Sequence, residues 1–177
     1  MSELTVSDTD GQEHFIWLQE ADDTCGPACI YMIERMRRLA CVVGGEQRIT
    51  FLTSLLPNGY SEGRGTQSYS ALKKVLDRIG IGSAAMVVSN MATFVGQAFF
   101  PFIARVGWSG GGGHFVVAVK TSGSGNLVCL DPWYGLVERP LNALPSYSVQ
   151  ENYRTRMSMS NAAGGILSGH VIFPNRS

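Results

Sequence analysis

The chain has 177 residues, of which 45% are hydrophobic and 16% are charged. A chain of this length and composition can bury one sizeable core, so we expect a folded domain and not general disorder. The 14 basic and 14 acidic residues cancel to a formal net charge of zero. Because the chain has neither a basic excess nor a clearly basic face, it is not expected to bind nucleic acid.

Residues 1–12 are polar and acidic, and we expect them to form a flexible tail before a single domain over residues 13–177. They lack the basic and apolar stretches of a conventional secretory signal. The longest apolar stretches are shorter than the ~20 residues that a membrane-spanning helix needs, so membrane insertion is not expected. Four cysteines without a secretory signal favour reduced thiols. We therefore expect a cytoplasmic protein, or one secreted by a route without a conventional signal.

Helical periodicity dominates the first half of the chain. After Cys25 the apolar residues recur at three- and four-residue steps, which predicts an amphipathic helix to about Ala40. Asp23 and Thr24, just before Cys25, are candidate N-caps of this helix. Two further helices are expected, over about 46–56 and 66–79.

The second half predicts strands, because short β-branched and aromatic runs alternate with Gly- and Ser-rich turns. The expected strands lie at 84–88, 101–106, 115–119, 127–130, 136–138 and 170–173. Residues 90–97 predict a short helix or turn, and residues 140–168 predict a loop with local helix. Helices followed by strands indicate an α+β fold, with a helical N-terminal half packed on a C-terminal antiparallel sheet.

Cys25 is the first residue whose position indicates chemistry. It stands where a helix begins, and there the unpaired backbone N–H groups and the helix dipole favour an anion such as a thiolate. A lone cysteine at such a place is about as often a small buried residue. Its interpretation therefore depends on the groups that can accompany it.

His114 and Asp131 are 17 residues apart, across an expected β-hairpin. Pairing Lys120 with Gly125 would place His114 directly opposite Asp131, with side chains within ~5 Å of each other. A carboxylate there fixes the imidazole tautomer and leaves the second ring nitrogen for a thiol. This spacing predicts Cys25 as nucleophile, His114 as its base and Asp131 as the group that orients the base.

Further residues are candidates because they flank this triad. Gln19 lies six residues before Cys25, where its side-chain amide would donate a hydrogen bond to the oxyanion of a tetrahedral intermediate. Trp108, Gly113 and Trp133 flank the catalytic positions and are candidate substrate-binding residues. Packing in the core is the alternative role for the two tryptophans.

Four short segments follow one another in order between about Phe15 and Leu144. They are Gln19-x5-Cys25-Gly26-Pro27-Ala28-Cys29, Pro101-Phe102-Ile103-Ala104, Gly113-His114-Phe115-Val116-Val117 and Leu130-Asp131-Pro132. As a set they resemble the C39 and C39-like peptidases, which belong to the papain-like cysteine peptidases. The best-known members are N-terminal domains of bacteriocin-exporting ABC transporters, which cleave leader peptides after a double glycine.

The resemblance implies a papain-like fold and a peptide or protein substrate, without a cofactor. It also implies that Cys25 is the nucleophile, His114 the general base and acid, Asp131 the orienting carboxylate and Gln19 the oxyanion-hole donor. No transporter segment follows in the sequence. We therefore expect a free-standing processing protease, or a secreted bacterial effector or toxin.

Several alternatives stay open at this stage. A triad does not identify its acceptor, so a papain-like acyltransferase, transglutaminase or glutamine deamidase fits the same residues, as does a peptide-binding module without activity. A metal site is disfavoured because Cys25 and Cys29 lack the tight spacing of zinc ligands. His14 and His170 have no carboxylate partner visible in a motif, and we expect structural roles for both.

Overall fold

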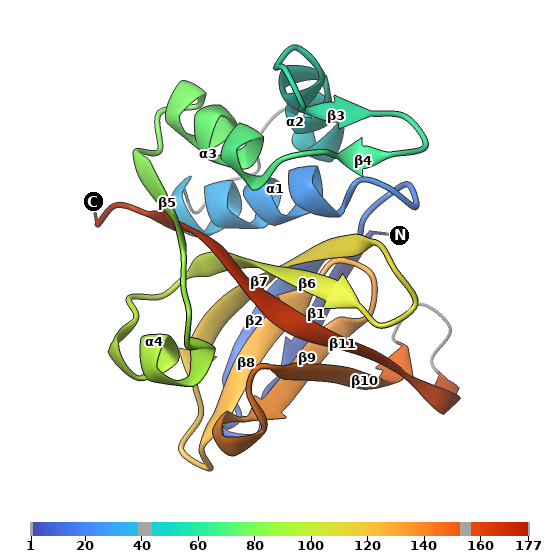
Figure 1. The fold of residues 1–177 in the computed structure, drawn as a ribbon, viewed down its shortest axis with the longest axis vertical. Coiled ribbons are helices and arrows are strands. Elements are labelled where there is room, and N and C mark those ends of the chain that lie inside the picture. The colour runs from blue at the N-terminus through green and yellow to red at the C-terminus, as the bar shows by residue number, and fades with distance from the viewer. Residues whose placement is uncertain (1, 39–43, 153–156, 177) are drawn as a thin grey trace.

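The computed structural model describes residues 2–38, 44–152 and 157–176, with the side chains in these ranges except those of 150–152 and 157–163. It has an α+β architecture built on one large antiparallel sheet, with helices on both faces (Figure 1). None of the helices in the described ranges is long and apolar enough to cross a membrane.

Seven antiparallel strands form the large sheet. They are β5 (Ser83–Val87), β6 (Phe102–Trp108), β7 (Gly113–Thr121), β8 (Asn126–Asp131), β9 (Gly135–Pro140), β10 (Ser146–Asn152) and β11 (Met157–Pro174). Their order across the sheet is β10-β11-β6-β7-β8-β9, and β5 also pairs with β11. A 3-10 turn, η1 (Leu141–Ala143), joins β9 to β10. Strands β6 and β7 are thus central, and their side chains meet protein on both faces.

Four helices accompany the sheet. They are α1 (Cys25–Arg38), α2 (Gly45–Ser54), α3 (Tyr69–Arg78) and α4 (Met91–Gln97). Helix α1 lies between the sheet and the other two long helices, and it contacts β7, α2 and α3 (Figure 1). Residues 25–34 of α1 are all buried, which fixes the start of this helix against the sheet.

The core is divided into two apolar clusters by the sheet, and β7 contributes to both. Phe115 and Val117 pack in the cluster under α1, together with Ile33. Val116 and Ala118 pack in the cluster on the opposite face. Successive strand residues point to opposite faces, so the continuous apolar run of β7 is what a strand buried on both sides requires.

Most expected elements are confirmed. The first two expected helices correspond to α1 and α2, although the expected end at Ala40 lies outside the described residues. The third helix begins only at Tyr69, because the chain before it forms a short ribbon of β3 (Tyr60–Ser61) and β4 (Gly65–Thr66). The short helix expected over 90–97 is α4, and every expected strand is present.

The expected flexible tail over residues 1–12 is wrong. It contains strand β1 (Glu3–Ser7), which pairs with β2 (Glu13–Trp17) as an antiparallel ribbon. The N-terminal half is therefore not helical throughout. The alternation of Leu4 and Val6 with polar residues is a strand signal, but it spans only five residues in an otherwise polar segment. The partly buried Leu4 and Val6 pack against the core under α1.

The loop expected over residues 140–168 is also wrong, since β10 and most of β11 lie there. The buried residues Tyr147 and Val149 alternate with the less buried Ser146 and Ser148. That period of two is a strand signal, but it is short and lies among Ser, Asn and Gly residues. Long-range pairing of β11 with β5, β6 and β10 explains why weak local propensity still gives strand.

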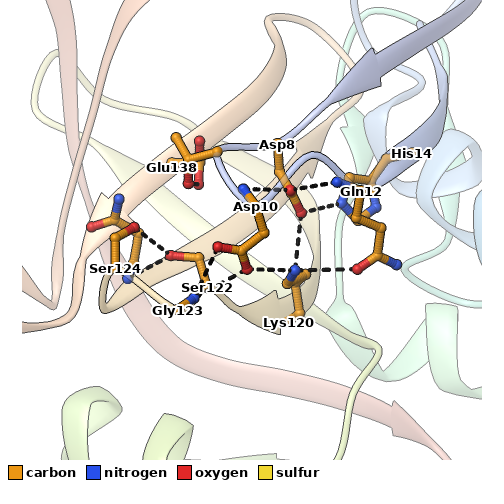
Figure 2. A network of polar contacts seen from close by, with 11 residues as sticks. Asp8, Asp10, Gln12, His14, Lys120, Ser122, Gly123, Ser124 and Glu138 are labelled. Carbon is orange, nitrogen blue, oxygen red and sulfur yellow. Dashed lines mark hydrogen bonds and ion pairs between the residues drawn. The ribbon is translucent and has the colours of Figure 1, made fainter.

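A polar network fastens the β1–β2 ribbon to the turn after β7 (Figure 2). Asp8 Oδ2 lies 2.8 Å from His14 Nε2 and 3.2 Å from Lys120 Nζ. Asp10 accepts from Lys120 Nζ at 2.8 Å and from the Gly123 N–H at 3.0 Å. His14, which has no carboxylate partner in any sequence motif, thus lies beside the buried Asp8 carboxylate. The network braces the hairpin of β7 and β8.

Replacing Asp8 should lower the stability of this ribbon in a pH-dependent way. The hydrogen bond with His14 lowers the pKa of Asp8 most, burial opposes this, and bonds with Gln12 and Lys120 lower it further, so the net pKa lies well below its ordinary value. The stabilisation from ionised Asp8 is then present above the unfolded pKa of about 3.9 and is lost as the pH falls. Asp8→Asn should have a lower Tm than the parent at pH 7.

Thermal unfolding at several pH values checks this prediction. The Tm difference between Asp8→Asn and the parent should shrink below about pH 4, where Asp8 of the unfolded chain is protonated. Glu13→Gln is the matched control, because Glu13 is an exposed carboxylate on the same ribbon. Equal Tm values for Asp8→Asn and Glu13→Gln at pH 7 would contradict the role of the network.

Candidate active site

A cavity of about 830 Å³ opens between the start of α1 and the ends of β6 and β7. Its wall is formed by the loop before α1, the β3–β4 ribbon, residues of the inner strands β6, β7 and β11, and the turn after β8. The predicted site residues that line it are Gln19, Cys25, Trp108, Gly113, His114 and Trp133. Asp131 is fully buried and bonded to His114. One cavity thus brings the predicted residues together.

Cys25 is the first residue of α1 and is 9% exposed. The helix starts here because the Thr24 carbonyl accepts the first helical hydrogen bond, from the Ala28 N–H at 3.0 Å. The other candidate N-cap, Asp23, has a different role: its carboxylate accepts a hydrogen bond from the Tyr60 hydroxyl at 3.0 Å. The thiol therefore lies at the positive end of a buried helix and faces a cavity.

His114 and Asp131 form a buried pair, with 2.7 Å between His114 Nε2 and Asp131 Oδ1. The predicted register is wrong, because Val117 pairs with Leu130 and a β-bulge follows Ala118. Asp131 is thereby shifted two positions along β7 from the predicted place opposite His114. A shift of two residues keeps the same face of the sheet, so the two side chains still meet diagonally.

This geometry assigns the two nitrogens of the His114 ring. Asp131 takes Nε2, which leaves Nδ1 for the Cys25 thiol. Burial by itself lowers the pKa of His114, but the charge of Asp131 and hydrogen bonds with Asp131 and Cys25 outweigh it and raise this pKa to about 10. The imidazolium is therefore the favoured form of His114 in the folded protein at neutral pH.

The Asp131 carboxylate is saturated with hydrogen bonds. Oδ1 also accepts from the backbone N–H groups of Trp133 at 2.8 Å and Tyr134 at 3.0 Å, and Oδ2 accepts from the Tyr147 hydroxyl at 2.7 Å. Burial raises the pKa of Asp131. The charge of His114 and the hydrogen bonds from His114, Tyr147 and the Trp133 N–H outweigh burial, so the net pKa of Asp131 is below its ordinary value. Asp131 is thus a stable anion that holds His114 in place.

Tyr147 is the site residue that the sequence did not reveal. It comes from β10, in the segment expected to be a loop, and its side chain is fully buried. The alternation of residues 146–149 was the available signal for its strand. Its contact with Asp131 spans 16 positions of the sequence and depends on how β10 pairs with β11, which no local pattern predicts.

Gln19 is buried and links the two halves of the site. Its backbone N–H donates to the Pro132 carbonyl at 2.7 Å, and its side-chain Nε2 donates to the Ala21 carbonyl at 2.7 Å. The first bond ties the residue to the turn that carries Asp131, and the second to the loop before Cys25. Gln19 lines the same cavity as the thiol, as an oxyanion donor must.

The flanking residues have different surroundings. The ring of Trp108 stacks on that of His114, with centroids 5.6 Å apart and 28° between the planes. Trp108 therefore restrains the His114 ring as well as lining the cavity. A Cβ at Gly113 would lie 2.8 Å from Arg105 Nη2, so a side chain there would displace the Arg105 guanidinium. Trp133 is half-buried in the cavity wall.

The other thiols and histidines have different environments. Burial is the main cause of a raised pKa for both Cys29 and Cys129, so these thiols are neutral. His170 lines the cavity but bonds Ser168 Oγ at 2.9 Å. Among the described residues, no group of three or more His, Cys, Asp or Glu side chains is placed to hold a metal ion.

Comparison with known proteins shows the family and the fold of this chain. The family model described as the Peptidase C39 family matches residues 14–144. No curated protein matches the chain. The peptidase domain of Streptococcus ComA, a bi-functional ABC transporter involved in a quorum sensing pathway, has a TM-score of 0.62 at 14% identity, over 92% of this chain and 98% of that chain.

A second solved structure has a similar fold. It is a double glycine motif protease from an AMS/PCAT transporter in complex with the leader peptide, with a TM-score of 0.60 at 14% identity. The match covers 92% of this chain and 91% of that chain. At this identity the two likenesses show a shared fold, the papain-like fold of C39 peptidase domains.

Removing the Tyr147 hydroxyl tests its role at Asp131. Tyr147→Phe deprives a buried carboxylate oxygen of its partner, and the free energy of unfolding should fall by about 1–3 kcal/mol. Denaturant unfolding measures the loss. Tyr60→Phe is the control, since it removes a hydroxyl that donates to the half-buried Asp23. A loss no larger than that of the control would contradict the role assigned to Tyr147.

Proposed function

Since the chain belongs to the Peptidase C39 family, we propose that it is a cysteine peptidase in which Cys25 attacks the scissile peptide bond. His114 acts as general acid and base, and Asp131 orients His114. The observation that carries this proposal is the buried His114–Asp131 pair beside a cysteine at a helix start, all at one cavity. The raised pKa of His114 supports its imidazolium form beside the Cys25 thiol.

The proposed reaction has two halves. The Cys25 thiolate attacks the carbonyl carbon, a C–S bond forms, and the carbonyl electron pair moves to oxygen. His114 Nδ1–H then protonates the leaving amine as the C–N bond breaks, which gives a thioester. In the second half His114 takes a proton from water, the hydroxide attacks the thioester, and the thiolate leaves. The Cys25 N–H and the Gln19 amide donate to the oxyanion.

The proposed substrate is a leader peptide with a double glycine before the scissile bond. The support is the family match and the structural likeness to a double glycine motif protease in complex with its leader peptide. A synthetic peptide across a Gly-Gly junction should be cut after the second glycine, and its Ala-Ala counterpart should be cut far more slowly. Mass spectrometry of the products detects the cut, with Cys25→Ala as the inactive control. Equal cutting of both peptides, or ammonia release without cutting, would contradict the proposed substrate or reaction.

Replacing Asp131 should change both the rate and its pH dependence. Asp131→Asn keeps the shape but removes the charge that raises the His114 pKa. We expect kcat/KM to fall about 1,000- to 10,000-fold, by analogy with other triads. The basic limb of the pH profile should move to lower pH, because His114 then loses its proton more readily.

The pH profile of kcat/KM for both proteins provides the measurement. Asp22→Asn is the matched control, because Asp22 is an exposed carboxylate in the wall of the same cavity. Its profile should keep the parent's basic limb. An unmoved basic limb in Asp131→Asn would remove Asp131 from the triad.

Gln19→Ala tests the oxyanion donor. Loss of one such donor should lower kcat by about 100- to 1,000-fold, with a smaller effect on KM, because the bond is made to the transition state. Steady-state kinetics with the Gly-Gly peptide separates the two parameters. A similar rise in KM with an unaltered kcat would assign Gln19 to substrate binding and not to oxyanion stabilisation.

A further inference from the structure

Arg105 places a positive charge in the wall of the cavity, on the face of the sheet that α1 covers. Strands β6 and β7 pair Arg105 with Phe115 and Gly107 with Gly113. Directly paired residues project from the same face, and Phe115 packs in the cluster under α1. Arg105, Phe115 and Gly113 all line the cavity. The guanidinium is thus next to the strand end that carries His114.

Gly113 makes room for this guanidinium. A Cβ at Gly113 would lie 2.8 Å from Nη2 and 3.0 Å from Nε of Arg105, closer than side chains normally approach, whereas one at Gly107 would lie at an ordinary contact distance of 3.7 Å from Nη1. Gly113 does not have a positive φ, so its backbone conformation does not require glycine. The absent side chain at Gly113 instead lets the Arg105 group lie against the β6–β7 pair.

The charge of Arg105 is not neutralised by a carboxylate among the described residues, since none of the ion pairs found there includes it. Of the nearby carboxylates, Asp131 is saturated, and Asp23 accepts from the Tyr60 hydroxyl and the Gly63 N–H. A half-buried guanidinium has five donors and keeps its charge at any working pH. Such a group in a cavity is available to an anion.

A second basic group extends the row across the sheet. Val171 of β11 pairs with Ala104 of β6. Because the two strands are antiparallel, His170, which precedes Val171, lies on the side of Arg105, which follows Ala104. The His170 ring lines the cavity and rests edge-on against Tyr69 of α3. From His114 the cavity wall therefore runs past Arg105 to His170, and an extended peptide bound along this wall would pass Arg105.

We propose that Arg105 is a specificity-determining residue that binds a carboxylate of the peptide substrate. The carboxylate is either an acidic side chain near the scissile bond or the new C-terminal carboxylate of the released leader. Both fit the planar fork of a guanidinium, which binds carboxylates through two parallel hydrogen bonds. This inference rests on the proposed peptidase function and adds a charge requirement to its substrate.

Kinetics with paired peptides tests the side-chain carboxylate. A single glutamate is moved along the Gly-Gly peptide one position at a time, and each peptide has a glutamine counterpart. At the position that reaches Arg105, the parent should cut the glutamate peptide with a kcat/KM about 10- to 100-fold higher, mainly through KM. Arg105→Met should cut both peptides with equal kcat/KM, and Arg105→Lys should give an intermediate ratio. Arg64→Met, which removes an exposed cation at the same cavity, should keep the parent's ratio.

Binding tests the terminal carboxylate and separates the two proposals. Calorimetry with Cys25→Ala measures the affinity of the cleaved leader as free acid and as C-terminal amide, with and without Arg105→Met. Tighter binding of the free acid, lost in Arg105→Met, would assign the terminal carboxylate. A glutamate preference lost in Arg105→Met, in cutting or in binding, would assign the side chain.

If Arg105→Met folds with the parent's Tm and neither preference depends on Arg105, the inference is overturned. Binding with these preferences but no cutting by the parent would overturn the proposed function alone.

Discussion

The rest of the site depends on the buried Asp131 carboxylate, which accepts hydrogen bonds from four groups. His114 Nε2, two backbone N–H groups of the following turn and the Tyr147 hydroxyl all point at it. A buried charge is tolerated only when it is paired and hydrogen-bonded. These bonds therefore connect β7, the β8–β9 turn and β10, and they determine which nitrogen of His114 faces the thiol.

The two faces of the central strands contribute different groups to the site. On one face, buried apolar residues seat α1 against β7, so the helix presents Cys25 at the end of the sheet. The Asp131 carboxylate and Tyr147 lie on the opposite face, where Asp131 bonds both Tyr147 and His114. Arg105 lies on the α1 face beside two glycines, in the cavity itself. In the proposed mechanism, the groups that orient His114 and the group that binds the substrate carboxylate thus lie on opposite faces of one sheet.

The sequence predicted which residues meet at the site better than it predicted the contacts around them. Cys25, His114 and Asp131 stand at element boundaries, where local spacing and residue type carry information. The predicted register of β7 and β8 was wrong because Lys120 pairs with Val128, three residues farther along the chain than the expected Gly125. The β-bulge after Ala118 reduces this difference to two residues, which preserves the face, so the pair still meets. Tyr147 was missed because its strand exists through long-range pairing. The role proposed for Arg105 depends on its having no carboxylate partner among the described residues, which no local pattern contains.

Alkylation by iodoacetamide would show whether His114 activates Cys25. Mass spectrometry would follow the modification of all four cysteines at mildly acidic to neutral pH, in the parent and in His114→Ala. We expect fast modification of Cys25 alone, slowed in His114→Ala, because a thiolate–imidazolium pair supplies the reactive anion. Equal, slow modification of every thiol in the parent would mean that His114 does not activate Cys25.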